Sequence, residues 1–194
     1  MLTDSSLGNA ERYSQGGHLV LLCHDDPKRL GGRFSLLSFK SARSKRVASS
    51  ILSAECLAMN QGIEDAVFIQ TWLHELIHPT MRAAELIDVD PALLLPIDGA
   101  MDCQDLYEVL IKPTAPVPTN KALTLHLAAL REYKQRGHVR AWVWVDTNDQ
   151  LANVLTKLNA DGTLPMDELS TALRTNHYEP TRPFKWQGLT VTTT

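Results

Sequence analysis

Apolar residues recur with two different spacings along the chain, and each spacing predicts a different secondary structure. Residues 18–23 form an apolar run, and residues 33–39 form a second strand-like segment after a turn-rich stretch of aspartate, proline and glycine. These two segments predict the antiparallel strands of a hairpin. Residues 52–77 instead place small and apolar side chains three and four positions apart, which predicts a long amphipathic helix that ends at Pro79.

The rest of the chain alternates between further strands and helices. Residues 93–101 and 140–145 predict strands, although Pro96 is poorly placed for a strand interior. Helices are expected at residues 103–111, at 120–135 behind an Asn120 cap, at 149–158 and at 166–174. This order predicts one α/β domain at residues 1–158, with a mixed sheet flanked by helices, and an extra helix with a flexible tail at residues 159–194.

Bulk composition narrows the class of protein. The 194 residues are 44% hydrophobic and 21% charged, which fits a folded domain. A net charge of −3 provides no overall positive field, so phosphate groups would have to be bound by a local basic cluster. The 3 cysteines are widely spaced, and neither a signal peptide nor a membrane-spanning run is evident. These features predict an intracellular protein of the cytoplasm or nucleus, with no membrane partner.

Acidic residues stand at three places where an apolar element begins or ends. Asp4 follows an apolar stub, Glu55 lies in the first turns of the long predicted helix, and Asp102 follows the third apolar segment. An acid directed toward a core is costly unless a partner such as a metal ion compensates it. Carboxylates that converge from separate elements suit a hard cation such as Mg²⁺. Asp98 is an alternative to Asp102 as the third acid.

Five stretches around these acids carry a resemblance to a known family. They are TDSSLGN at residues 3–9, SQGGHLV at 14–20, SSILSAECLA at 49–58, MDCQDLY at 101–107 and DQLANVLTK at 149–157. In this order they resemble the ribonuclease H domain of copia-type retrotransposon polyproteins. The resemblance implies a ribonuclease H-like fold and an upstream reverse transcriptase segment as a partner.

The resemblance also implies an activity and a set of site residues. In that family two Mg²⁺ ions, which Mn²⁺ can replace, support cleavage of the RNA strand in an RNA–DNA hybrid. Asp4, Glu55 and Asp102 would be the catalytic metal ligands. Asn153 stands where the family's closing catalytic aspartate is expected. Because an amide carries no formal charge, this departure predicts a weakly bound ion and weakened or absent nuclease activity.

A second departure concerns the first strand. In the family's fold the strand leading into the first aspartate is central in the sheet, and only residues 1–3 represent it here. The first central strand is therefore expected to be largely truncated, with unpaired backbone groups left on its neighbours. An upstream segment or a partner chain would then supply the strand.

A basic cluster precedes the long predicted helix. It consists of Lys40, Arg43, Lys45 and Arg46. Such a run is commonly a solvated loop, but beside three metal-binding acids it favours contact with the phosphates of a hybrid. These four residues are the predicted substrate-binding residues.

Residues 74–78 read HELIH and match the HExxH pattern of zinc metalloproteases. His74 and His78 would share a helix face and could hold Zn²⁺, with Glu75 as general base. Pro79 interrupts the helix at the second histidine, and Glu85 is the one nearby acid with reach, so an exposed helix end is favoured. A third alternative is a non-catalytic nucleic-acid-binding remnant, which predicts hybrid affinity without cleavage.

Overall fold

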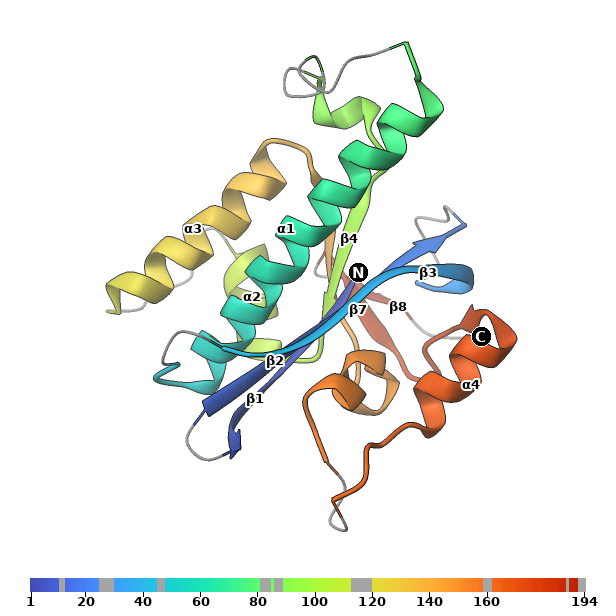
Figure 1. Ribbon diagram of the computed structural model, residues 1–194. Coiled ribbons are helices and arrows are strands. Elements are labelled where there is room, and N and C mark those ends of the chain that lie inside the picture. The colour runs from blue at the N-terminus through green and yellow to red at the C-terminus, as the bar shows by residue number, and fades with distance from the viewer. Residues whose placement is uncertain are drawn as a thin grey trace.

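A mixed β-sheet with helices on both faces organises the chain (Figure 1). The computed structural model describes residues 1–10, 13–24, 30–44, 48–80, 85, 89–112, 120–158, 162–187 and 189–191. Within these residues the strand order across the sheet is β6-β3-β2-β1-β4-β5-β7-β8. The expected α/β class, with a mixed sheet flanked by helices, is confirmed.

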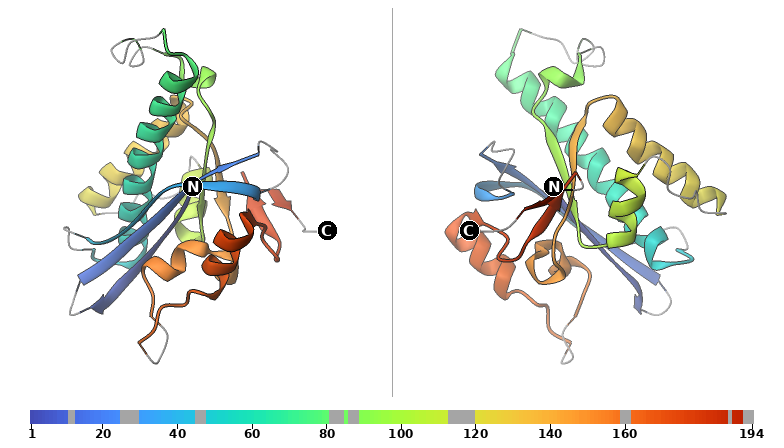
Figure 2. Two further views of the ribbon diagram at one scale, coloured as in Figure 1. Left: turned by 45° about the vertical axis from the view of Figure 1, so that its right-hand side comes forward. Right: turned by 180° about the vertical axis from the view of Figure 1, so that it is seen from behind.

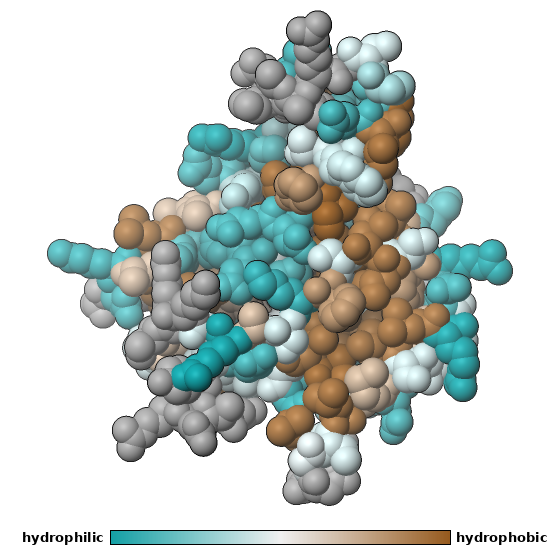
Figure 3. Space-filling model, in the orientation of Figure 1, coloured by the Kyte–Doolittle hydropathy of each residue, from teal (hydrophilic) through white to brown (hydrophobic). Residues whose placement is uncertain are grey.

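Three antiparallel strands form one part of the sheet. They are β1 (Leu2–Ala10), β2 (Tyr13–Cys23) and β3 (Gly32–Arg43). The predicted hairpin at residues 18–23 and 33–39 is confirmed, and both strands extend beyond their apolar runs into polar residues. The face shown in Figure 3 carries an apolar area toward the right, where Figure 1 places β3. Leu22 on β2 and Phe39 on β3 are both exposed.

Only Leu2 and Thr3 of β1 precede Asp4, but the strand continues beyond Asp4, which the sequence did not predict. The strand spans 9 residues between β2 and β4, and Asp4 is near its beginning, not at its end. It continues past Asp4 because the polar residues Ser5 and Ser6 pair with β2. Their polarity explains why the hydrophobic pattern did not indicate this continuation.

Two parallel strands continue the sheet beyond β1. β4 (Ile97–Met101) runs parallel to β1, with Leu2 opposite Ala100, and parallel to β5 (Val139–Trp144). β4 begins immediately after Pro96, so the proline lies outside the ladder, as its missing N–H requires.

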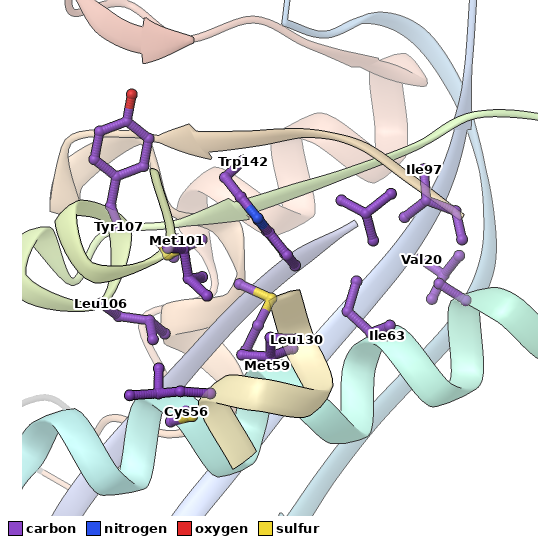
Figure 4. Packing of buried hydrophobic residues seen from close by; sticks show 14 of the residues in the cluster. Val20, Cys56, Met59, Ile63, Ile97, Met101, Leu106, Tyr107, Leu130 and Trp142 are labelled. Atoms are coloured by element: carbon purple, nitrogen blue, oxygen red, sulfur yellow. The ribbon is translucent and has the colours of Figure 1, made fainter. Parts of the chain in front are cut away.

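Helices α1 (Ile51–Ile77), α2 (Gln104–Ile111) and α3 (Lys121–Gln135) cover one face of the sheet (Figures 1 and 2). The long helix predicted at residues 52–77 is confirmed, and Ser50 caps it by accepting a hydrogen bond from the Ser53 N–H at 3.1 Å. Asn120 caps α3 as predicted. Met59, Ile63 and Trp142 are buried in the core between these helices and the sheet (Figure 4).

The opposite face is covered by short elements. η3 (Thr147–Asp149), η4 (Leu151–Leu155) and α4 (Asp167–Thr175) follow β5, and residues of η4 and α4 pack into the core on this face. A further 3₁₀ turn, η2 (Pro91–Leu93), precedes β4. The α-helix expected at residues 149–158 is wrong in type, because two 3₁₀ turns occupy this stretch. Gln150 separates them with an extended backbone, and its side chain accepts from the Ala152 N–H and donates to the Thr3 carbonyl.

The segment after residue 158 adds strands to the sheet as well as the expected helix. β6 (His177–Tyr178) pairs with β3, β7 (Phe184–Trp186) pairs with β5, and β8 (Leu189–Val191) pairs with β7. The described part of residues 159–194 is therefore more than a helix with a flexible tail. No helix within the described residues is long and apolar enough to cross a membrane.

Candidate metal centre

Three acids from three separate elements converge beside the start of β1 and the C-terminal end of β4. Asp4 lies in β1, Glu55 in the second turn of α1, and Asp102 directly after β4. Ligand oxygens from the three side chains all lie within 4.8 Å of one another. The register explains the meeting of the two aspartates, because each follows the Leu2–Ala100 pair by two residues on adjacent parallel strands. The structure thus brings together the three acids singled out in the sequence.

The two carboxylate oxygens of Glu55 have different surroundings. Its Oε1 accepts a hydrogen bond from the Ser5 N–H at 3.2 Å, while its Oε2 is buried without a hydrogen-bond partner among the described residues. Burial, followed by the nearby charges of Asp4 and Asp102, raises the pKa of Glu55 to about 8. A buried carboxylate oxygen without a partner, beside two further acids, is an arrangement that a bound cation would satisfy.

Lys157 lies against the same group of acids. Its Nζ is 3.2 Å from Asp4 Oδ1 and 3.8 Å from Asp102 Oδ2. Thr156 donates its hydroxyl to the other oxygen of Asp4. Burial raises the pKa of Asp4, and the contacts with Thr156 and Lys157 partly offset this shift. One side of the acid group therefore already faces an ammonium, whereas the buried oxygen of Glu55 has no such partner.

Asn153 is linked to the acid group by Lys157, which donates a hydrogen bond to it and also contacts Asp4 and Asp102. Its Nδ2 donates to the Thr147 carbonyl at 2.6 Å, and its Oδ1 accepts a hydrogen bond from Lys157. The side chain is thus oriented with its amide oxygen toward the acid group and its NH₂ toward the backbone. A carboxylate at this position would bring a fourth negative charge close to the three acids.

The two candidates for the third acid have different surroundings. Asp98 forms a two-point ion pair with Arg140, with distances of 3.0 and 2.6 Å, and it lies outside the acid group. Asp102 belongs to the group, and its carbonyl accepts a hydrogen bond from Trp144 Nε1 at 2.9 Å. Trp144 on β5 therefore holds the backbone that carries Asp102.

The basic cluster is described only in part. Lys40 and Arg43 lie exposed on β3, whereas Lys45 and Arg46 lie outside the described residues. Asp4 is opposite Gly17 on β2, and Gly17 is opposite Ser41 on β3. Two strand spacings separate this part of β3 from Asp4, which corresponds to about 10 Å. Arg43 alternates with Ser41 and so shares the face of the sheet on which Asp4 lies.

The histidines of the HELIH segment are close to each other but not to the acid group. The rings of His74 and His78 are 4.4 Å apart, and the His78 N–H donates to the His74 carbonyl at the end of α1. Among the described residues, the acid group is the one cluster of histidine, cysteine and acidic side chains close enough to share a metal. Within that part of the chain, the two histidines have no third metal ligand.

Several residues of the site did not emerge from the sequence as functional. Lys157 and Thr156 belong to the matched stretch at residues 149–157, but their contacts with Asp4 depend on how the 3₁₀ turns fold back onto β1. For Trp144 the sequence indicates only a place in the predicted strand at residues 140–145. For Lys157 the available signal is that it is the one lysine or arginine in the five matched stretches, whose other charged residues are acidic.

Comparison with known proteins gives no further guidance: no protein family matches the chain, nor does any curated protein or solved structure.

Proposed function

We propose that this chain is a ribonuclease H-like domain of a retrotransposon polyprotein, which binds Mg²⁺ or Mn²⁺ and hydrolyses the RNA strand of an RNA–DNA hybrid at a reduced rate. The convergence of Asp4, Glu55 and Asp102 within 4.8 Å carries the proposal. The position of Asp4 and Asp102 on adjacent parallel central strands supports it, as does the partnerless buried oxygen of Glu55.

The side chains present fit a hard divalent cation. Mg²⁺ and Mn²⁺ prefer oxygen ligands, and Asp4, Glu55 and Asp102 offer carboxylates from three rigid elements. When bound, such ions activate water for attack on a phosphate and stabilise the leaving oxygen. The chain's own residues prepare the site: Thr156 orients Asp4, and Trp144 holds the backbone at Asp102. Glu55, with its pKa near 8, must release a proton to become a ligand.

Two features of the site support a reduced rate. Asn153 provides an amide where the family has an aspartate, so this position contributes no negative charge. Lys157 places an ammonium beside Asp4 and Asp102, where it opposes the binding of a second cation. We therefore expect one ion to bind more tightly than the other.

The substrate would be held mainly through its backbone. Arg43 lies on β3, about two strand spacings from Asp4 and on the same face of the sheet, and can approach a phosphate beside the cleaved bond, whereas Lys40 points to the opposite face and would contact a more distant phosphate. Because the net charge is −3, this local attraction is the main electrostatic contribution and should weaken steeply with salt. Recognition of a hybrid by its backbone and 2′-hydroxyls requires little reading of base sequence.

A cleavage assay with matched variants tests the proposal. A labelled RNA–DNA hybrid is incubated with Mg²⁺ or Mn²⁺ and the unsubstituted chain, Asn153→Asp or Asp4→Asn. We expect slow cleavage of RNA, faster cleavage by Asn153→Asp, and none by Asp4→Asn. Asn148→Asp is the matched control, because it adds the same charge at an exposed position of the neighbouring 3₁₀ turn.

Two outcomes would contradict this function. Hybrid binding without cleavage by either the unsubstituted chain or Asn153→Asp, with both proteins folded, would identify a non-catalytic binding domain. Zinc co-purifying with the chain and lost in His74→Ala would instead favour the metalloprotease alternative.

A further inference from the structure

Helix α1 carries apolar side chains on two sides. Its inner side buries Met59 and Ile63 in the core against the sheet. On its outer side Phe68, Trp72 and Leu76 remain 70%, 49% and 57% exposed. The outer side of a surface helix ordinarily carries polar residues, because only the inner side is needed for the core. These three residues, which we call the outer stripe, therefore add an exposed apolar surface that the core of this chain does not use.

The outer stripe forms a single ridge along α1. Its members are spaced four residues apart, so they lie one above the other on the helix surface over about 12 Å. In Figure 1 helix α1 lies in front of the sheet with α3 beside it, and it contacts β1, β2 and β4 from that side. A ridge with this spacing packs into the groove between matching ridges of another helix. The outer stripe therefore has the shape of a helix-packing surface.

Acidic side chains border the outer stripe. Helix α1 contains four acids and neither lysine nor arginine. Two of the acids, Glu64 and Glu75, are 11 positions apart, which is about three helical turns, so they lie along the same side of the helix. Glu64 precedes Phe68 by four residues and Glu75 follows Trp72 by three, which makes each acid a neighbour of an aromatic residue of the stripe. One border of the outer stripe is therefore negatively charged.

The described part of the chain supplies no base to this border. Within that part, neither Glu64 nor Glu75 has a lysine or arginine partner, and Arg136 at the end of the neighbouring α3 is already paired with Glu132 at 2.5 Å. Asp65, the remaining acid of the outer side, is held by side chains of β2 and β3. A second copy of α1 would add acids and no base, so charge complementarity requires a different, basic partner.

We propose that the outer stripe is a docking surface for an amphipathic helix of a partner protein, whose apolar side is bordered by lysine or arginine. Phe68 and Trp72 would provide the main contacts, because large aromatic side chains supply much of the binding energy of protein interfaces. The basic residues of the partner would pair with Glu64 and Glu75 and fix its orientation. This surface is separate from the metal centre, so the outcome of the nuclease assay does not bear on it.

Peptide binding to the full chain tests the proposal. The probe is a fluorescein-labelled peptide of about 14 leucine and lysine residues, with leucine at helical spacing, followed by fluorescence anisotropy. One control peptide has glutamate in place of lysine, and the other has glutamine in place of leucine. We expect saturable binding of the probe and at least about tenfold weaker binding of each control. Binding of the probe no tighter than either control, or binding of none of the three, would overturn the proposal.

Alanine variants locate the surface. Phe68→Ala and Trp72→Ala should each weaken binding of the leucine–lysine peptide at least about tenfold. Ile51→Ala and Leu125→Ala are the matched controls, because these apolar residues are 64% and 71% exposed but lie outside the outer stripe, and they should leave binding unchanged. Because all four side chains are exposed, circular dichroism should show folded variants. Unchanged binding in both aromatic variants would exclude this surface.

Charge variants test the choice of partner. Combined Glu64→Gln and Glu75→Gln should weaken binding of the leucine–lysine peptide at least about tenfold and reduce its dependence on salt. Glu168→Gln, at an exposed position of α4, should change neither. Sedimentation of the chain alone should show a monomer. Concentration-dependent dimers abolished by Phe68→Ala would assign the outer stripe to a second copy and overturn the proposal.

Discussion

The ammonium of Lys157 lies 3.2 Å from Asp4 Oδ1 and 3.8 Å from Asp102 Oδ2, so the candidate metal centre contains its own cation. A bound divalent ion must share these oxygens with the lysine or displace it. Lys157 is therefore expected to set the cation affinity of the site from within the chain.

Lys157→Met should raise the affinity for Mn²⁺ about tenfold, because the competing charge is lost and the acids keep their negative charge. Lys157→Arg should leave the affinity close to its original value. Titration calorimetry measures both, with Lys112→Met as the control, since Lys112 pairs with Glu108 on the surface of α2. An affinity that falls in Lys157→Met would show that the lysine supports the metal site instead of opposing it.

Glu55 should make the metal-free protein less stable as the pH rises. Its pKa is about 8 in the folded chain against 4.5 for the unperturbed group, so the folded state holds the extra proton between these values. The free energy of unfolding then falls with rising pH across that window, by up to about 1 kcal/mol per pH unit, and levels off above it.

Glu55→Gln removes this contribution. In urea denaturation with EDTA, the variant should exceed the unsubstituted chain in stability at pH 8 and lose most of the advantage near pH 5. The difference between the two proteins isolates Glu55 from other titrating groups such as His18. Stability curves that stay parallel from pH 5 to 8 would show that Glu55 ionises normally.

Trp144→Phe should weaken metal binding without unfolding the protein. The change removes the indole N–H that donates to the Asp102 carbonyl at 2.9 Å but keeps an aromatic ring beside Lys185. Loss of such a supporting contact is expected to cost about tenfold in Mn²⁺ affinity and about 1 kcal/mol in the free energy of unfolding. Trp72→Phe, on the exposed side of α1, is the matched control and should change neither quantity.

Asp149→Ala should destabilise the fold. The buried carboxylate accepts hydrogen bonds from the Thr181 N–H and hydroxyl and from the Arg182 N–H, at 2.8 to 3.1 Å. The substitution leaves these donors without their acceptor and should lower the free energy of unfolding by about 3 kcal/mol. Denaturation in urea measures the loss, and Asp167→Ala, at an exposed helix start, should cost less than about 1 kcal/mol.

The sequence predicted the meeting of the three acids because each stands at the boundary of an element with a clear pattern. Asp4 and Asp102 come together because each lies two residues after a paired position, Leu2 or Ala100, on adjacent parallel strands. Glu55 follows from the cap at Ser50, which determines where α1 begins. The boundaries of the patterned elements and the resemblance of the motifs around the acids were therefore sufficient to predict this part of the site, whereas the register that brings the two aspartates together comes from the structure.

Other features depended on contacts between distant segments. The apolar spacing of residues 149–158 is compatible with an α-helix, but the contact of Gln150 with the Thr3 carbonyl divides the stretch into two turns. Lys157 comes directly after the second of these turns, next to Asp4, so its position also depends on this contact. Strands β6, β7 and β8 have only two or three residues each, too few for an alternating pattern to be recognised.

The hydrogen bonds from Thr181 and Arg182 to Asp149 connect the C-terminal segment to the 3₁₀ turns beside the candidate metal centre. The same stretch of 3₁₀ turns carries Asp149 and Asn153 and leads to Lys157, and Tyr178 donates its hydroxyl to the Asp149 carbonyl at 2.9 Å. A version that ends at residue 158 would keep all five stretches that resemble ribonuclease H. It would lose the hydrogen bonds from Tyr178, Thr181 and Arg182 that hold Asp149 and the 3₁₀ turns leading to Lys157. Truncation is thus expected to alter the geometry of the candidate metal centre although Asp4, Glu55, Asp102 and Asn153 are all retained.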